Sequence, residues 1–403
     1  MGFEQVVLKS WRENLLFSVL VELTYRCNLD CFFCYNDLGL RGAPLATEQY
    51  YRFFADLRDM EVLNLTLSGG EPLAHPDFLR LGARARELGF VVRIKSNGHA
   101  LRGEMARRVR DEIDPFVIEV SLHGATAEVH DRQTRVAGSF QRLLANLEEM
   151  QRLGLRVKIN STLTAWNEHQ IEEMLDLAEA LGMPLQFDPD VTPRDDGDRE
   201  PLRVTASAAG VLRLFSAMAE RAARRAGAEG ALEAAAVAVA PAASATAANS
   251  AAPTGAAGTG RGARAVAPGA AVARGADDGL IPTPARKHCG AGSSGIAVDP
   301  YGNVYPCVQW RRPVGNLREQ SIVEIWAASR GLREVRELTV KAKEMIDGYG
   351  SGGAYLSFCP GNAAVLTGDP LRIYPAAERR RELTEQWQRS EEKKKALLPV
   401  LLS

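Results

Sequence analysis

The sequence lacks the features that would direct a chain to a membrane or to nucleic acid. Its N-terminus has no succession of basic, apolar and small residues of the kind that forms a signal peptide. Its longest uncharged run, residues 234–260, contains hardly any large apolar side chain and would insert poorly into lipid. The net charge of −1 gives no field of one sign to attract a polyanion. We therefore expect a cytoplasmic protein that has neither a membrane nor a nucleic acid as partner.

Cysteine is scarce, with six residues in a chain of 403. Three disulfides would suit a small secreted protein, but in a large chain without a signal sequence the pattern favours metal ligation. Only one CxxC pair exists, Cys31 to Cys34. A structural zinc site usually takes four ligands from two separated pairs, so zinc is the weaker alternative, although the spacing alone does not eliminate it.

Aromatic residues are absent between Phe215 and Tyr301. Much of this stretch, residues 226–280, consists of Ala, Gly, Pro, Ser and Thr with scattered Arg. Such a composition cannot bury enough apolar surface to offset the entropy of ordering the chain. We expect a disordered insertion here.

The first half of the chain alternates short apolar runs with segments that have helical spacing. The predicted strands are 17–23, 62–68, 90–96, 116–121, 155–161 and 184–188, and the predicted helices are 47–60, 76–88, 140–153 and 168–181. About six βα units, fewer than in a full barrel of roughly 250 residues, predict an α/β fold with a partial (β/α)6 TIM-like barrel. The expected organisation is an N-terminal segment 1–16, the barrel 17–200, a linking helix 201–225, the insertion 226–280, a compact domain 281–375 and a charged helix 376–403.

Three cysteines with three and then two residues between them follow the first predicted strand: Cys27, Cys31 and Cys34. Thiolates this close can turn toward one soft metal centre, and thiolate is the ligand that iron–sulfur clusters select. A four-iron cluster held by three cysteines leaves one iron without a protein ligand. That iron can bind a substrate or cofactor directly.

Followed by Tyr35, this loop resembles the cluster loop of the radical SAM enzymes, in which S-adenosylmethionine chelates the fourth iron of a [4Fe-4S] cluster. The resemblance extends to a GGEP motif after the second strand, which in the family holds the methionine amino group. It also assigns positions near the ribose and the methionine carboxylate. The residues carried over are Gly69, Gly70, Glu71 and Pro72 for GGEP, Ser96 and Asn97 for the ribose, and Ser121 and Arg135 for the ribose and carboxylate.

Two histidines lie in the motif that contains Ser121. The family more often has Asp where this chain has His123, so His123 is either an acid or base with a pKa near neutrality or a hydrogen-bonding turn residue. We favour the turn residue, and we expect His130 to buttress structure. Residues 190–198 resemble the segment after the sixth strand in peptide-modifying members, which predicts a substrate-side loop.

A second group of cysteines lies beyond the insertion. The spacing of Cys289, Gly302 and Cys307, with Cys359 later, resembles a SPASM domain, a module that holds auxiliary iron–sulfur clusters. This chain has fewer cysteines than a complete domain of that kind. We expect one auxiliary cluster on Cys289, Cys307 and Cys359, with an open iron or His288 as fourth ligand. The alternative is a degenerate domain with three buried thiols and no cluster.

The resemblance implies an enzyme that reductively cleaves S-adenosylmethionine and abstracts a hydrogen from a substrate carbon. It favours a ribosomally made precursor peptide as substrate, with a cross-link, thioether or other redox modification as product. A flavodoxin- or ferredoxin-type electron donor is expected. The segment before Cys27 is too short to form a peptide-binding domain, so the leader of a peptide substrate would be held either by a separate peptide-recognition protein or by the SPASM region. The alternatives are a radical SAM enzyme for a small molecule or tetrapyrrole, and a non-catalytic electron carrier or scaffold. The intact GGEP motif argues against the last.

Overall fold

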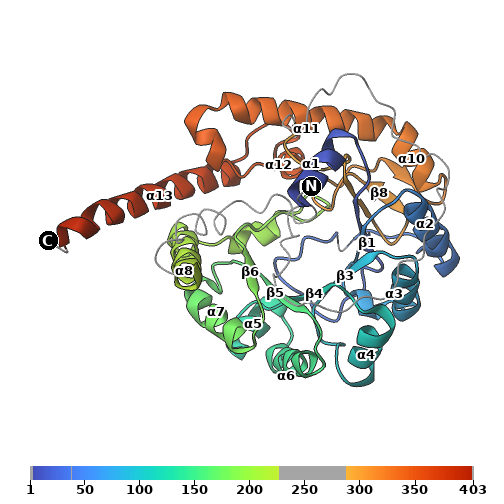
Figure 1. Ribbon diagram of the computed structural model, residues 1–403, viewed down its shortest axis with the longest axis horizontal. Coiled ribbons are helices and arrows are strands. Elements are labelled where there is room, and N and C mark those ends of the chain that lie inside the picture. The colour runs from blue at the N-terminus through green and yellow to red at the C-terminus, as the bar shows by residue number, and fades with distance from the viewer. Residues whose placement is uncertain (1–2, 38, 227–286, 402–403) are drawn as a thin grey trace.

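The centre of the protein is one nine-stranded sheet with strand order β6-β5-β4-β3-β2-β1-β7-β8-β9. The computed structural model describes residues 3–37, 39–226 and 287–401 (Figure 1). The predicted insertion 226–280 lies, except for its first residue, outside the described residues. The strands are β1 (Ser18–Glu22), β2 (Asn64–Ser68), β3 (Val91–Ser96), β4 (Val117–Ser121), β5 (Val157–Thr162), β6 (Leu185–Asp188), β7 (Gly295–Val298), β8 (Asn303–Tyr305) and β9 (Gly315–Asn316).

The first six strands form a parallel arc with helices on its outer face (Figure 1). Each predicted strand is present to within about two residues, and the predicted partial (β/α)6 barrel is confirmed. The helices of this half are α1 (Phe3–Arg12), α2 (Thr47–Asp59), α3 (Phe78–Glu87), α4 (Gly103–Arg108), α5 (Ala127–Thr134), α6 (Ser139–Arg152), α7 (Ile171–Ala180) and α8 (Ala208–Ala226). Short turns of helix lie at η1 (Pro72–Ala74), η2 (Val109–Ile113), η3 (Glu168–Gln170) and η4 (Glu200–Val204).

Alternation along the strands creates the core. Residues at every second position, such as Val92 and Ile94 on β3, belong to the main hydrophobic cluster between the sheet and the helices. The amphipathic helices contribute Tyr50 and Phe54 of α2 to the same cluster. The opposite face of β3 to β6 is mostly polar, and this decides what the interior of the barrel can hold.

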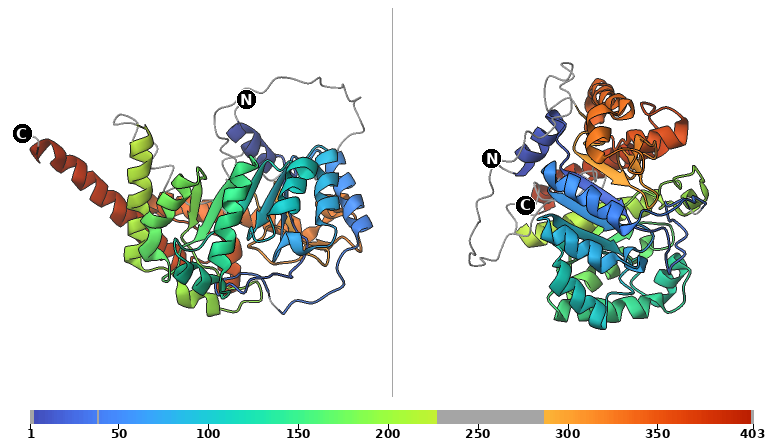
Figure 2. Two further views of the ribbon diagram at one scale, coloured as in Figure 1. Left: turned by 90° about the horizontal axis from the view of Figure 1, so that it is seen from below. Right: turned by 90° about the vertical axis from the view of Figure 1, so that its right-hand side faces the viewer.

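The C-terminal region continues the same sheet. Strand β7 pairs in parallel with β1, and β8 and β9 follow antiparallel. The remaining helices are α10 (Ile322–Ala328), α11 (Arg330–Gly348), η6 (Gly350–Tyr355), α12 (Pro360–Thr367) and α13 (Pro375–Leu401). Figure 2 shows the C-terminal elements grouped on one side of the barrel, with α13 projecting away from the body.

Three helices of the first half were not among the predicted ones: α1, α4 and α5. Helix α4 is only six residues long and runs into η2, so it offers less than two turns of periodic pattern. Helix α5 coincides with the His130 motif, whose polar residues hide its helical spacing. Among the described residues, no helix is both long and apolar enough to cross a membrane.

Candidate functional site

The first three cysteines lie on the loop that leaves the carboxyl end of β1. In a parallel barrel this is the end at which active sites occur. Cys27 is exposed, and Cys31 and Cys34 are half-buried. Desolvation and the neighbouring Cys34 and Cys27 raise the pKa of the Cys31 thiol, and desolvation also raises the pKa of the other two. The three sulfurs are therefore mutually close and protonated at neutral pH, so ligation of a cluster must release protons.

The GGEP turn packs directly on the start of the cluster loop. The amide of Gly70 donates to the Thr24 carbonyl at 2.7 Å, and the amide of Glu71 donates to the Arg26 carbonyl at 2.9 Å. A Cβ on Gly69, whose φ is +134°, would lie 2.3 Å from the Thr24 carbonyl oxygen. The glycines thus permit a close approach of the chain to itself. This contact makes the two motifs one structural unit.

Glu71 is buried at this junction, with 2% of its surface exposed. Its carboxylate accepts hydrogen bonds from the amides of Leu73 (3.1 Å) and Asn97 (2.8 Å) and from the Ser96 hydroxyl (2.9 Å). Burial nevertheless raises its pKa. A carboxylate has about four acceptor positions, so about one remains for an ammonium group. Pro72, the next residue, begins the η1 turn and fixes the backbone after the carboxylate.

Asn97 links this carboxylate to the cysteine loop. Its side-chain nitrogen lies 3.7 Å from the Cys27 sulfur and donates to the Asn28 side-chain oxygen at 2.8 Å. The other end of the Asn28 amide contacts His99 Nδ1 at 3.1 Å. The structure therefore brings Ser96, Asn97, Glu71 and Cys27 together, as a shared cofactor site requires.

Ser121 ends β4 and is half-buried on the same rim. Two residues further, the His123 ring packs edge-on against Phe33 of the cluster loop at 4.7 Å. The His123 amide donates to His130 Nδ1 at 3.1 Å, and its carbonyl accepts from Gln133. Burial lowers the pKa of His123 to about 3 and that of His130 to about 4. Both rings are neutral at pH 7, which fits the turn and buttress roles and does not suit a protonated acid.

These two rings predict a specific acid sensitivity. Both pKa values lie below the value of about 6.5 that histidine has in the unfolded chain. Below pH 6.5 the unfolded chain therefore binds more protons than the folded one. The stability that is present above pH 6.5 is lost as the pH falls. Between pH 7 and 5 the free energy of unfolding of the metal-free protein should fall by about 1–2 kcal/mol for each ring. Urea unfolding at both pH values tests this. His130→Asn should remove about 1–2 kcal/mol of the pH-dependent fall, which is the contribution of its ring. Replacing the exposed His169 by Gln should leave the fall intact, and an unchanged fall in His130→Asn would contradict the assignment.

Arg135 is placed differently from the other candidates. Its guanidinium makes a 3.2 Å ion pair with Asp30 and stacks over the Phe32 ring at 4.8 Å, with 40% of its side chain exposed. It thus touches the cluster loop from the outside. Its assignment to the methionine carboxylate stays a prediction.

A buried ion network, which the sequence did not reveal, joins the cluster loop to the C-terminal region. Glu22, fully buried at the end of β1, accepts two hydrogen bonds from Arg311 at 2.6 and 2.8 Å and one from the Tyr25 hydroxyl at 3.0 Å. Arg311 also lies 2.8 Å from the Asp195 carboxylate, whose pKa burial raises to about 7. The only sequence signal was a charged residue, Glu22, in an otherwise apolar strand.

The predicted substrate-side loop is fixed to the cysteine loop by two contacts. The Asp195 amide donates to the Tyr35 carbonyl at 2.8 Å. The Arg194 guanidinium donates to the Cys34 carbonyl at 3.0 Å. The Tyr35 side chain packs against a small hydrophobic cluster that joins Leu20 of β1 to the C-terminal residues Ala297, Tyr305 and Val308. The cluster loop is therefore held from the barrel side and the C-terminal side at once.

The three C-terminal cysteines also converge. Cys307 and Cys289 share a small hydrophobic cluster with Trp310. A Cβ on Gly361 would lie 2.4 Å from the Gln309 carbonyl oxygen, so the start of α12 presses on the loop after Cys307. Burial raises the pKa of Cys289 to about 12 and also that of Cys307 and Cys359, and Cys359 acts electrostatically on the other two. The donor set fits an iron–sulfur cluster with three thiolate ligands.

His288, the candidate fourth ligand, has one nitrogen already engaged. Its Nε2 lies 2.6 Å from the Phe358 carbonyl oxygen, to which it can only donate. Nδ1 is the nitrogen left for a metal. Burial lowers the pKa of this histidine, which favours the neutral form that ligates metals.

Two further observations bound the site. No group of three or more His, Cys, Asp or Glu in the described ranges is arranged to hold a single metal ion.

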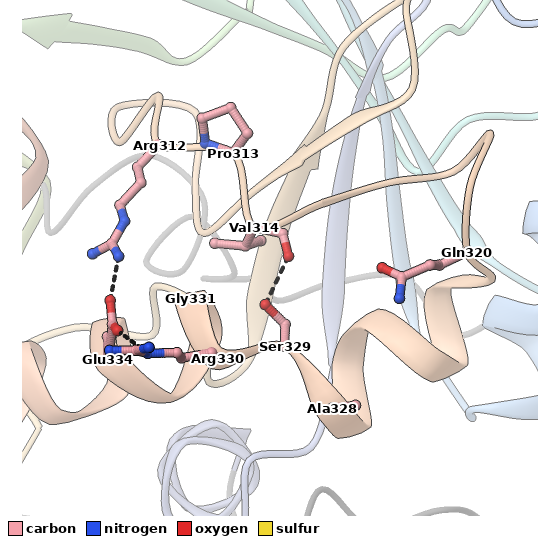
Figure 3. A pocket seen from close by; sticks show the side chains of 9 residues that line it. All are labelled: Arg312, Pro313, Val314, Gln320, Ala328, Ser329, Arg330, Gly331 and Glu334. Carbon is pink, nitrogen blue, oxygen red and sulfur yellow. Dashed lines mark hydrogen bonds and ion pairs between the residues drawn. The ribbon is translucent and has the colours of Figure 1, made fainter.

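A hollow of about 580 Å3 lies between the β8–β9 connection and the start of α11, where Glu334 pairs with Arg312 and Arg330 (Figure 3). None of the candidate site residues lines this hollow, so it is separate from the site.

A cysteine triad at the mouth of an open parallel barrel, joined to a GGEP turn and followed by a second triad, defines an iron–sulfur enzyme of the S-adenosylmethionine radical class. Comparison with known families agrees. Residues 21–178 match the radical SAM superfamily, and residues 289–347 match the iron–sulfur cluster-binding SPASM domain. The chain belongs to the radical SAM superfamily and carries a SPASM domain. The expected cofactors, a [4Fe-4S] cluster, S-adenosylmethionine and an auxiliary cluster, are confirmed at the level of these domains.

Relatives of two kinds are similar to this chain. Pre-heme d1 synthase of Dinoroseobacter shibae is 30% identical over 374 residues, 89% of this chain and 85% of the relative. AdoMet-dependent heme synthase of Methanosarcina barkeri is 26% identical over 359 residues, 88% of this chain and 94% of the relative. Mycofactocin maturase MftC of Mycobacterium ulcerans is 35% identical over 168 residues, only 41% of this chain and 45% of the relative.

The fold resembles solved structures over most of its length. The structure described as native anSMEcpe with bound AdoMet has a TM-score of 0.61 and 14% identity, covering 92% of this chain and 96% of that one. At this identity the likeness concerns the fold alone.

Proposed function

We propose that Cys27, Cys31 and Cys34 hold a [4Fe-4S] cluster beside an S-adenosylmethionine site, and that the enzyme abstracts a hydrogen atom from a substrate carbon. The observation that carries the proposal is the backbone contact between the GGEP turn and the start of the cluster loop. If bound together here and reduced by one electron, the cluster and S-adenosylmethionine would supply methionine and a 5′-deoxyadenosyl radical at this mouth. An electron carrier or scaffold would have no need of such a junction.

The chain's own residues bind the cofactor, orient it and exclude water from the site. Glu71 offers its remaining acceptor position to the ammonium group, and its other positions are fixed by Ser96 and Asn97. Ser121 lies on the same rim for the ribose. Phe33, packed on His123, is an apolar wall next to the cysteines. A preorganised and partly dry site of this kind keeps a reactive species in contact with its target.

The first candidate substrate is a tetrapyrrole. The relatives that align with nearly the whole chain, C-terminal region included, are named as heme and pre-heme d1 synthases. The C-terminal region borders the barrel interior through Arg311 and Tyr305 and so shapes what can enter it. A match over both halves therefore supports this class more strongly than a match over the barrel alone.

The second candidate is the precursor peptide that the sequence motifs favour. It is supported by mycofactocin maturase and by PqqA peptide cyclase of Ruegeria pomeroyi, 32% identical over 167 residues, or 41% of this chain. On this alternative a separate peptide-recognition protein would present the substrate. For either substrate a flavodoxin- or ferredoxin-type donor and the reducing cytoplasm remain predictions.

Anaerobic reconstitution with iron and sulfide, followed by assay for 5′-deoxyadenosine, tests the proposal. The wild type should hold about eight irons per chain, and a Cys289/Cys307/Cys359→Ala variant about four. Both should form the nucleoside with dithionite. A heme precursor and a candidate precursor peptide are then added in separate assays. The compound that is the substrate should raise nucleoside formation and should itself change in mass. A fully loaded wild type that forms no nucleoside would overturn the proposal.

A further inference from the structure

The interior face of the barrel is charged along β3 to β6. Val92 and Ile94 of β3 pack toward the helices, so Arg93 and Lys95 point the opposite way, into the barrel. The same alternation puts Glu119 of β4 on this face, because Ile118 and Val120 lie in the outer core. This face also carries Lys158, Asn160 and Thr162 on β5 and Gln186 and Asp188 on β6. Two apolar residues, Val91 and Val117, lie on it at the starts of β3 and β4.

This lining differs from that of a closed barrel, whose interior is filled by layers of branched apolar side chains. On the β1 side the interior is filled, by Leu20, Ala297, Tyr305 and Val308. On the β3 to β6 side most of the described side chains are cations, carboxylates, amides or hydroxyls. A polar interior wall of this kind is suited to line a binding space and not a packed core.

Register places three charges in one row across three strands. Lys95 pairs with Glu119, and Glu119 pairs with Lys158. Glu119, with 2% of its side chain exposed, lies 2.8 Å from Arg93 and 3.4 Å from Lys95. Asn160 donates to the same carboxylate at 2.8 Å. The contact from Lys95 to Glu119 is the longest of the three, and 28% of the Lys95 side chain is exposed. Lys95 can therefore contact a ligand while it stays close to Glu119.

The charges in this row act on one another strongly. Against the effect of burial, Lys95, Arg93 and Lys158 lower the pKa of Glu119 to about 2. Burial, together with Arg93 and Lys95, lowers the pKa of Lys158 to about 8 although Glu119 opposes the change. Asp188, the other acidic residue on this face, lies at the exposed carboxyl end of β6. Three cations, Arg93, Lys95 and Lys158, face two carboxylates here, so a further anion would lie near a net positive charge.

The row lies one layer below the mouth. Glu119 precedes Ser121 by two residues, which corresponds to about 6.6 Å along a strand. Lys95 directly precedes Ser96 and Asn97, which hold Glu71. An anionic group held by the row would therefore leave the carbon atoms next to it near the cofactor site.

We propose that Lys95 and Lys158 bind a carboxylate group of the substrate and thereby position the neighbouring carbon for hydrogen abstraction; this rests on the proposed function. The chemistry recognised is a carboxylate on a larger molecule. Its source is either a carboxylate side arm of a tetrapyrrole or an acidic residue of a peptide. Guanidinium and ammonium groups bind carboxylates by charge-assisted hydrogen bonds.

Binding of two probes to the anaerobic, fully reconstituted enzyme tests the proposal. The probes are a porphyrin whose side arms end in carboxylates, with its methyl ester as control, and a glutamate-rich peptide, with its glutamine counterpart as control. One acid probe should bind, its neutral counterpart should not, and binding should weaken as salt increases. The probe that binds identifies the source.

The variants isolate the row. Lys95→Met should weaken binding of that probe by about tenfold to a hundredfold, whereas Lys95→Arg should stay within about threefold of the wild type. Lys9→Met, on the exposed face of α1, should bind as the wild type does. Equal binding by wild type and Lys95→Met, or no binding of either acid probe, would overturn the proposal and leave the row as a structural ion network. Nucleoside formation by the wild type is measured in parallel, so failure of this proposal is distinct from failure of the proposed function.

Discussion

Replacing Arg311 by methionine is expected to lower the free energy of unfolding by about 3–5 kcal/mol. Arg311, with 7% of its side chain exposed, is bound to Glu22, which has no exposed surface, and to Asp195. Removing the cation leaves two buried carboxylates without their partner, and one of them ends the strand that precedes the cluster loop. Urea unfolding followed by circular dichroism measures the loss.

Arg312→Met is the matched control. Arg312 follows directly in sequence, but 46% of its side chain is exposed and its partner Glu334 is on the surface. Exposed ion pairs contribute about 0–1 kcal/mol, so this variant should change stability by no more than that. If both variants lost the same small amount, the Glu22 network would have to be hydrated and would not support the cluster loop.

Replacing Cys31 by alanine is expected to abolish formation of 5′-deoxyadenosine, to the background of the assay. Cys31 is the central thiol of the triad, and the other two act on it electrostatically. With two thiolates left, the first cluster loses one of its three cysteine ligands. Because the cluster supplies the electron that cleaves S-adenosylmethionine, the chemistry is lost with it.

Cys359→Ala is the control for this variant. It removes one thiol from the second triad, the N-cap residue directly before α12, and should lower only the iron of the auxiliary cluster. Cleavage of S-adenosylmethionine without substrate should persist. Iron analysis and electron paramagnetic resonance of both variants distinguish the two sites. Nucleoside formation by Cys31→Ala at the wild-type rate would contradict the assignment of the first triad.

The sequence predicted the strands and the motifs at their ends well, because both depend on the local pattern of residue types. The strands ending at Ser68, Ser96 and Ser121 follow from short β-branched runs, and their ends carry the residues that resemble the family motifs. Because parallel strands share one carboxyl edge, these motifs were expected to meet. The contacts among Glu71, Ser96 and Asn97 agree with that expectation.

What the sequence did not predict depends on contacts between distant segments. Glu22 and Arg311 are 289 positions apart, and no local pattern marks either as the partner of the other. The charge row around Glu119 was hidden for a different reason. Arg93 and Lys95 alternate with apolar residues, which is the usual pattern of a strand whose polar face lies in solvent. Only the fold shows that the polar face of β3 points into the barrel instead.

The pairing of β7 with β1 has a consequence for how the chain is made. Strand β1 is central in the finished sheet, yet one of its two neighbours is β7, encoded far downstream. While the ribosome is still making the intervening residues, one side of β1 has no strand to pair with. Open strand edges can pair with another chain, and distant pairings form late. A chain that stops before Gly295 would therefore present, directly beside its cysteine loop, an edge open to aggregation.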